Sequence, residues 1–116
     1  MTRDDCIFCM ICDGKKSADI IYQDDEMTAF WDQHPAAPVH ILFVPNKHIP
    51  SLNEVEEDEA ALLGRLMLKA REIAGQQGVR EKGYRLLLNI GEEGGQSVYH
   101  LHLHLFAGPH LLAVHG

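Results

Sequence analysis

The chain has no apolar run that could cross a membrane and few groups that would hold a polyanion. No stretch of about 18 apolar residues occurs in its sequence, and the N-terminal MTRDDCIFC lacks the apolar segment of a secretory signal. We therefore expect no membrane association and a cytoplasmic location. The sequence has only 10 Lys and Arg and 17 Asp and Glu, which gives a net charge of -7. Because phosphate backbones are held mainly by Lys and Arg, nucleic acid is not an expected partner.

Cysteine is scarce and confined to one place. Cys6, Cys9 and Cys12 fall within one short segment, which is poor material for disulfides that join distant parts of a chain. Metal binding or simple burial is the better interpretation. The apolar fraction of 46% and the charged fraction of 23% are typical of a globular protein. The length suits a single domain over residues 1–116 with one core.

The hydrophobic pattern predicts an α+β fold. The compact apolar segment CIFCMIC indicates a short N-terminal helix, and Asn53 with Glu56 suits the capping box of one long helix whose apolar stripe ends before Gly75 and Gly78. Strand-favouring segments occupy the remaining positions. The first two predicted strands are 20–22 and 28–31, joined by a turn at 24–26. The others are 40–45, which Pro45 ends, 84–90 and 98–106. Together they predict an antiparallel sheet of about five strands with helical cover.

Three histidines alternate with leucines in HLHLHLF, residues 100–106. Because side chains alternate between the faces of a strand, His100, His102 and His104 would share one face, about 7 Å apart, with the leucines in the core. A solvated polar face is one explanation, but such faces usually carry Thr, Lys, Glu and Ser. An expression tag would be contiguous and terminal. A metal site made of all three rings is awkward at this spacing, although one or two of them could serve.

The histidines can also act as a nucleophile and as proton donors, because imidazole titrates near neutral pH. Just upstream, GEEGGQS offers a phosphate close approach to backbone N–H groups at Gly94 and Gly95 and a hydroxyl at Ser97. A glycine-rich loop alone is weak evidence. Its position next to the histidine row points to chemistry on a phosphate.

GGQSVYHLHLHLF resembles the signature of the histidine triad superfamily. IIYQDDEMTAFWD, APVHILFVPNKHI and GYRLLLNIG are similar to its branch of small nucleotide-binding proteins, the purine nucleoside phosphoramidases. The resemblance implies a HIT-like fold that dimerises with a second copy, and a purine nucleotide as ligand, AMP or GMP or their phosphoramidate or acyl-adenylate conjugates. It implies cleavage of the P–N bond in adenosine or guanosine 5'-phosphoramidates, with no organic cofactor.

The resemblance also assigns catalytic roles. His102 would attack the α-phosphorus and form a nucleotidyl-histidine, which water then hydrolyses; a covalent intermediate divides one hard displacement into two easier ones. His104, with Ser97, would contact the phosphate and help to protonate the leaving amine. His40 would support the triad from the neighbouring strand, and His100 would complete the catalytic set. For His40 alone, a hydrogen-bonded core histidine would be the ordinary interpretation.

The nucleotide-binding positions follow from the same resemblance. Asp32 would hold the ribose hydroxyls, although a turn or helix-capping Asp is the alternative. Gln33 stands where an apolar residue usually flanks the base, and the end, AGPHLLAVHG, lacks the Trp that in some relatives reaches the partner's site. The remaining expected contacts are Asn89, Gly95, Ser97, Val98, His102 and His104.

Cys6 and Cys9 form a CxxC pair, and two thiolates need two further ligands to complete a tetrahedral zinc site. His48 and His100 are the candidates, and some histidine triad proteins carry such a site. In that case zinc would be structural and would hold the start of the strand that bears His102. The alternative is that both cysteines are simply buried apolar residues. Cys12 is left as a spare thiol.

Other functions share these residues. Another branch of the superfamily hydrolyses dinucleoside polyphosphates with the same histidines. A nucleotide-sensing or interaction module would bind AMP or GMP without useful turnover. A zinc-dependent structural protein would have no turnover at all.

Overall fold

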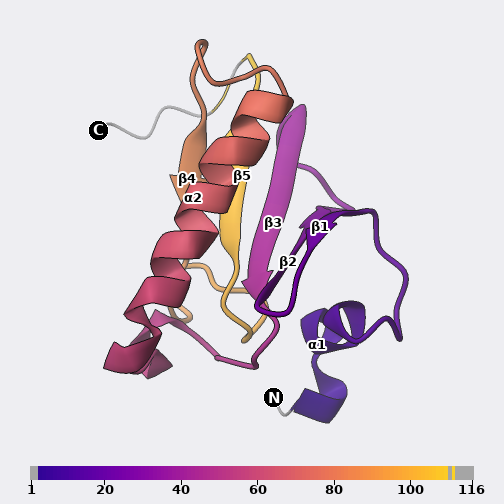
Figure 1. The fold of residues 1–116 in the computed structure, drawn as a ribbon, viewed down its shortest axis with the longest axis vertical. Helices are drawn as coiled ribbons and strands as arrows, with labels where there is room; N and C mark the ends of the chain where they lie inside the picture. The colour runs from indigo at the N-terminus through magenta and orange to yellow at the C-terminus, as the bar shows by residue number, and fades with distance from the viewer. Residues whose placement is uncertain (1–2, 110, 112–116) are drawn as a thin grey trace.

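A five-stranded antiparallel sheet, in the order β1-β2-β3-β5-β4, forms the centre of the fold. The computed structural model describes residues 3–109 and 111. The strands are β1 (Ile20–Gln23), β2 (Met27–Trp31), β3 (Val39–Pro45), β4 (Arg85–Leu87) and β5 (Leu103–Ala107). β4 lies at one edge of the sheet, and β1 lies at the other (Figure 1). The expected order of elements is therefore confirmed, including the hairpin of β1 and β2.

The two faces of the sheet have separate apolar clusters, because successive residues of a strand point to opposite sides. On one face, Ile41 and Phe43 pack with Leu66, Ala70 and other residues of the long helix α2 (Ala60–Gln76). On the other face, Leu42 and Val44 pack with α1 (Ile7–Cys12). The two helices thus lie apart, with α2 along the sheet and α1 near its β1–β2 side (Figure 1).

The long helix begins later than the sequence indicates. The prediction of a start at Asn53 is wrong, because residues 52–54 and 57–59 form separate 3-10 turns before α2. Ser51 caps the first turn by accepting a hydrogen bond from the backbone N–H of Asn53. The carboxylate of Glu59 accepts from the N–H of Glu56, so the capping interaction falls three residues further along. The expected end before Gly75 is also too early, because α2 continues through Gly75 to Gln76. Gly78, two residues further on, adopts a positive φ of 74°.

Two predicted strands are too long. The strand expected over 84–90 spans only Arg85–Leu87, and the strand expected over 98–106 spans Leu103–Ala107. β5 cannot extend backwards along β3, because β3 ends at Pro45, which has no N–H to continue the ladder. Instead, the N–H of Leu101 donates to the carbonyl of Ile49. His100 and His102 therefore precede the strand, and His100 is fully buried rather than part of an open sheet face.

The leucines behave as expected. Leu101, Leu103 and Leu105 are all buried in the cluster beneath α2. Most of the C-terminal segment AGPHLLAVHG lies outside the described residues, and so does the expectation about the Trp that this segment lacks. None of the helices in the described ranges is long and apolar enough to span a bilayer.

Candidate functional site

A cavity of about 240 Å³ lies beside the histidines, between α1 and the ends of β2 and β5. Six residues expected to act on a nucleotide line it: Asp32, Gln33, Ser97, Val98, His102 and His104. Its other walls are mostly apolar and come from α1, the segment after α1, β2, the loop after β2, and β3: Ile7, Phe8, Ile11, Lys16, Ala18, Phe30, Trp31, His34 and Leu42. The structure therefore brings His102 and His104 together with the acid that follows β2, whereas His100 does not line the cavity.

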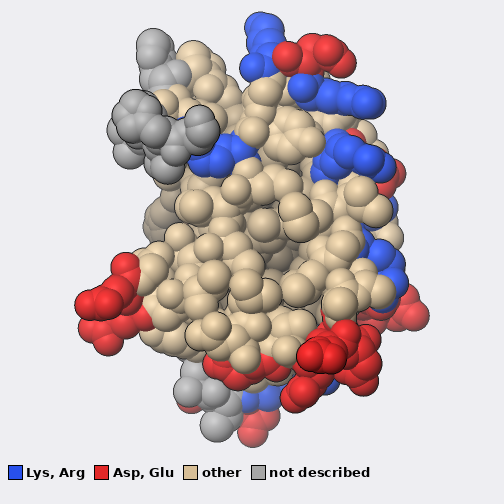
Figure 2. Space-filling model, turned by 90° about the vertical axis from the view of Figure 1, so that its left-hand side faces the viewer, with Lys and Arg blue, Asp and Glu red and all other residues tan. Residues whose placement is uncertain are grey.

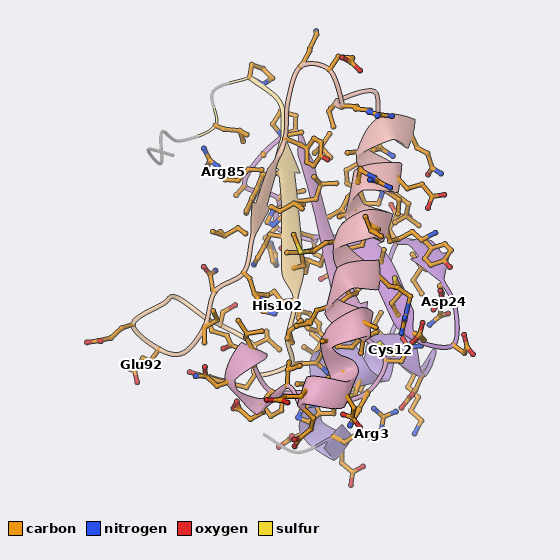
Figure 3. All side chains as sticks on the ribbon, turned by 60° about the vertical axis from the view of Figure 1, so that its left-hand side comes forward. Arg3, Cys12, Asp24, Arg85, Glu92 and His102 are labelled. Atoms are coloured by element: carbon orange, nitrogen blue, oxygen red, sulfur yellow. The ribbon has the colours of Figure 1, made fainter. Side chains whose placement is uncertain are left out.

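His102 is held in one orientation by its own backbone. Its Nδ1 lies 2.8 Å from the carbonyl oxygen of His100. A carbonyl oxygen only accepts, so Nδ1 must carry the hydrogen, and in the neutral ring the lone pair then resides on Nε2. The side chain is 5% exposed and lies just before β5 (Figure 3). A buried ring with its lone pair on Nε2 is suited to nucleophilic attack.

A chain of hydrogen bonds fixes the tautomers of the other two rings. The N–H of Ala36 donates to Nδ1 of His40 at 3.0 Å, so the hydrogen of His40 resides on Nε2. That Nε2 lies 2.9 Å from Nδ1 of His104. Nδ1 of His104 must then accept, and its hydrogen resides on Nε2, which is buried without a partner among the described residues. This series of hydrogen bonds therefore leaves the Nε2–H of His104 as an unused donor on a residue that lines the cavity.

Burial keeps the site histidines neutral. It lowers the pKa of His104 to about 4, with a smaller effect from the nearby His102. Burial also lowers the pKa of His102, although the hydrogen bond to the carbonyl of His100 and the charge of Asp32 oppose this shift. The pKa of His40 is lowered as well, again mainly by burial. At neutral pH these rings are therefore uncharged, and each can donate through one nitrogen and accept through the other.

Asp32 both caps a turn and lines the cavity. Its Oδ1 accepts from the backbone N–H of His34 at 2.8 Å, which is the turn-capping role. Its Oδ2 lies 3.5 Å from Nε2 of His40, and the residue also lines the cavity. A carboxylate has lone pairs for both sets of contacts. The capping bond therefore holds this side chain at the cavity without using up its acceptors.

The glycine-rich loop after β4 is braced by Gln96, a buried residue that the sequence analysis did not single out. Its Nε2 donates to the carbonyls of Pro50 at 2.7 Å and Val98 at 3.0 Å, and its Oε1 accepts from the N–H of Gly91. These bonds join the two ends of the loop and set the backbone that carries Ser97. Asn89 and Gly95 lie next to each other but are not among the residues that line the cavity.

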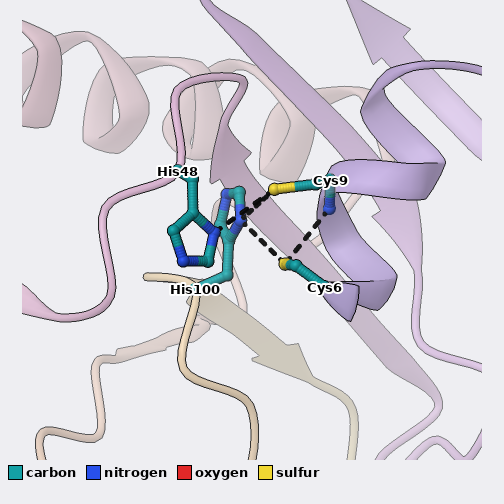
Figure 4. Close-up of side chains that lie close together, drawn as sticks. All are labelled: Cys6, Cys9, His48 and His100. Atoms are coloured by element: carbon teal, nitrogen blue, oxygen red, sulfur yellow. Dashed lines mark hydrogen bonds between the residues drawn. The ribbon is translucent and has the colours of Figure 1, made fainter. Parts of the chain in front are cut away.

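Cys6, Cys9, His48 and His100 form a second cluster, at the start of α1 (Figure 4). Their ligand atoms all lie within 4.8 Å of one another. Nε2 of His100 lies 2.7 Å from the carbonyl of Pro45 and must donate to it, so the lone pair of His100 is on Nδ1. That Nδ1 lies 3.3 Å from Sγ of Cys6 and 3.4 Å from Sγ of Cys9. Nδ1 of His48 lies 3.3 Å from Sγ of Cys9.

The apolar wall of the cavity was missed at the sequence level. The sequence assigns Phe8 and Ile11 only to a short N-terminal helix, whereas in the structure they are buried against the sheet and also line the cavity. Their spacing of three is a signal for a shared helix face, but it does not say what the face covers. Lys16, which also lines the cavity, lies between α1 and β1, and no pattern in the sequence indicates a role for it.

Known proteins that are similar to this chain in sequence and in structure belong to the histidine triad superfamily. The family model "Scavenger mRNA decapping enzyme C-term binding" matches residues 5–114. A purine nucleoside phosphoramidase from Escherichia coli is 47% identical over 105 residues, which cover 90% of this chain and 88% of that protein. A HIT family hydrolase from Legionella pneumophila is 41% identical with a TM-score of 0.90, and the match covers 93% of this chain and 96% of that one. A Zn-bound histidine triad family protein from Mycobacterium smegmatis is 27% identical with a TM-score of 0.78 and covers 90% of this chain and 76% of that one.

The chain therefore belongs to the family that this model describes, within the histidine triad superfamily. Within the superfamily it is a nucleotide-binding hydrolase of the branch that contains the purine nucleoside phosphoramidases. The resemblance in the sequence and the expected α+β fold, with its five-stranded antiparallel sheet, long helix and short N-terminal helix, are confirmed.

Proposed function

We propose that the protein hydrolyses the P–N bond of adenosine or guanosine 5'-phosphoramidates through a covalent nucleotidyl-His102. The observation that carries this proposal is the orientation of His102, whose Nδ1 donates to the carbonyl of His100 and leaves a nucleophilic Nε2 in a ring that lines the cavity. The similarity to a purine nucleoside phosphoramidase supports the choice of bond.

In this reaction Nε2 of His102 attacks the α-phosphorus and the P–N bond breaks. The amine leaves with a proton, because an amide anion is a poor leaving group. His104 offers its unpartnered Nε2–H to the phosphate and the leaving nitrogen, and Ser97, which lines the same cavity, offers a hydroxyl. Water then hydrolyses the P–N bond to His102, releases the 5'-monophosphate and restores the free imidazole.

The rest of the nucleotide is assigned along the cavity. Asp32 is the acceptor for the ribose hydroxyls, since its carboxylate is fixed at the wall by His34. The base lies against the apolar side chains from α1 and β2, near Gln33. Asn89 and Gly95 do not line the cavity, so we assign them an indirect role through the shape of the glycine-rich loop. Gly95 adopts a φ of +86° there, beside the side chain of Asn89.

Mass spectrometry of the intact protein tests this function. Rapid quenching with base, which spares the acid-labile P–N bond to histidine, should reveal a species heavier by one adenylyl group after mixing with an adenosine phosphoramidate. Peptide mapping should locate that group on His102. His102→Ala should give no adduct and lose several orders of magnitude in turnover. AMP alone serves as the control without a P–N bond. Normal turnover by His102→Ala would contradict the mechanism, and faster cleavage of dinucleoside polyphosphates than of phosphoramidates would assign the site to the alternative hydrolase.

We also propose that Cys6, Cys9, His48 and His100 hold a structural zinc ion. The donor set suits zinc, because two sulfurs and two imidazole nitrogens form a tetrahedral site, and the lone pair of His100 already faces both sulfurs. The Zn-bound relative supports the choice of metal. Zinc would supply no step of the reaction. Elemental analysis should find one zinc per chain in the wild type and in Cys12→Ser, and none in Cys9→Ser; absence of zinc from all three would contradict the proposal.

A second copy of the chain is the proposed partner of the face that contains β4 and α2. β4 is an edge strand, and an apolar groove lies beside it, lined by Leu52, Leu63, Leu66, Met67, Leu86, Leu88, Leu101 and Leu103. Figure 2 views the molecule from this side and shows charged residues mainly around the margin of a hollowed, largely uncharged centre. Met67→Lys should convert a dimer into a monomer in light scattering, whereas Leu68→Lys, on α2 but outside the groove, should not.

A further inference from the structure

α1 takes part in both sites at once. Cys6 is its N-cap and Cys9 lies in its first turn, and both belong to the cysteine and histidine cluster. Ile7, Phe8 and Ile11 of the same helix line the cavity. A helix of six residues has almost no stability of its own, so its position depends on what holds it from outside.

Phe8 is the direct contact between α1 and the ring of His102, whereas His100 of the cluster reaches the same ring through its own carbonyl oxygen. Its ring centroid lies 5.1 Å from that of His102 and 6.0 Å from that of His100, edge to face in both pairs. It also packs edge to face against Phe30 at 5.5 Å. Phe8 is 7% exposed, so a shift of α1 must move this side chain against His102 or open a gap beside it.

Few polar contacts outside the cluster fasten α1. Cys12 is held to β2 and to the strand before it by a side-chain hydrogen bond with Thr28 and by Nε2 of Gln23, which donates to its carbonyl. Next to α1, the exposed Arg3 pairs with Asp13 and donates to the carbonyl of Asn46. Exposed ion pairs contribute little. The two cysteines, in contrast, connect α1 to the chain after β3 through His48 and to the segment before β5 through His100. The cluster is thus the only polar link, among the described residues, between α1 and the segment that carries His102.

We propose that metal binding at this cluster fixes α1 and Phe8 as the wall of the nucleotide cavity and so tightens nucleotide binding. This inference rests on the proposed nucleotide and zinc functions. Phe8 is a positioning residue here, because it acts on the reaction through His102 and through the shape of the cavity. Coupling of two sites is reciprocal, so bound nucleotide must also tighten metal binding by the same factor.

Trp31 provides the measurement. It is the single tryptophan of the chain and lines the cavity, so its fluorescence reports AMP binding without turnover. The dissociation constant for AMP is compared between the zinc-loaded wild type, the chelator-treated protein, and the same sample after zinc is restored. We expect at least about fivefold weaker AMP binding without metal and full recovery with it, within the usual range of such couplings. The zinc dissociation constant, measured with and without saturating AMP, should change by the same factor.

Two variants separate positioning from a general loss of structure. In Phe8→Leu the metal should still bind, but its effect on AMP affinity should fall below about twofold, because the contact with His102 is lost. In Cys12→Ser, also on α1 but outside the cluster, the coupling should be unchanged. The measurements are made where circular dichroism shows a folded protein.

The outcomes are distinct. Equal AMP affinity with and without metal would overturn the inference and leave the nucleotide function intact. A chelated protein that is unfolded at every temperature would overturn it too, since zinc would then be a requirement of the fold. No AMP binding even by the zinc-loaded protein would contradict the proposed function itself.

Discussion

Nε2 of His40 lies 2.9 Å from Nδ1 of His104, and Ala36 holds the opposite nitrogen of His40 through its backbone N–H. The position of one backbone amide in the loop before β3 therefore decides which nitrogen of His104 carries hydrogen. Without His40, the ring of His104 is free to adopt the other tautomer or to rotate.

Replacement of His40 should test this relationship. In His40→Phe the ring is kept but the donor is lost, and we expect kcat to fall by roughly 10- to 100-fold, as for other residues that orient a functional group. KM should change less. His40→Gln, whose amide can donate to His104, should recover part of the loss in steady-state assays with an adenosine phosphoramidate. Equal kcat for the wild type and His40→Phe would show that the tautomer of His104 does not matter.

The sequence predicts the parts of this site that depend on local pattern and fails where tertiary contacts decide. The alternation around HLHLHLF correctly placed Leu101, Leu103 and Leu105 in the core, because burial follows the period of two. It wrongly extended β5 over His100 and His102. The end of β3 at Pro45, and the bond from His100 to the carbonyl of Pro45, set that boundary from 55 residues away.

The long helix α2 likewise was predicted in part from local pattern and missed in part where tertiary contacts decide. The apolar stripe of α2 was found, since Leu66, Ala70, Ile73 and Ala74 recur at helical spacing and are buried. Its start was missed because Ser51 and Glu59 both offer caps, and the sequence alone does not rank them. The role of α1 as a wall of the cavity depends on packing against β2 and β3, which no local pattern contains.

Stability should depend on pH through His104. Burial lowers its pKa from an ordinary value near 6.5 to about 4. Between these values the unfolded chain binds a proton that the folded protein does not, so the free energy of unfolding must fall as pH falls from 6.5 towards 4. Thermal melts across this range should show that decline. His104→Asn should make it shallower but not abolish it, because burial also lowers the pKa of His100 to about 4; an unchanged slope would contradict the assignment.

Glycine is required at only one of two testable exposed positions. A Cβ at Gly94 would lie 2.2 Å from the carbonyl oxygen of Ile90, a distance that forces the backbone to move. Gly94→Ala should therefore lower the melting temperature and raise KM by distorting the loop that carries Ser97. Gly64, inside α2, has nothing within 4 Å of the same atom. Gly64→Ala should stabilise the protein by about 0.5–1 kcal/mol, since alanine favours a helix, and a comparison of the two melts provides the check.

Gln96 should matter for the position of the loop rather than for chemistry. It is 7% exposed, and its amide makes three hydrogen bonds, to Gly91, Pro50 and Val98. Gln96→Glu removes both donors and sets a carboxylate against two carbonyl oxygens, which should cost about 1–3 kcal/mol or more in the free energy of unfolding. Because the same bonds set the backbone next to Ser97, KM should rise while the adduct on His102 still forms. Glu93→Gln, an exposed change in the same loop, is the matched control and should leave both unchanged. A Gln96→Glu variant with wild-type stability and KM would show that the loop holds its shape without these three bonds.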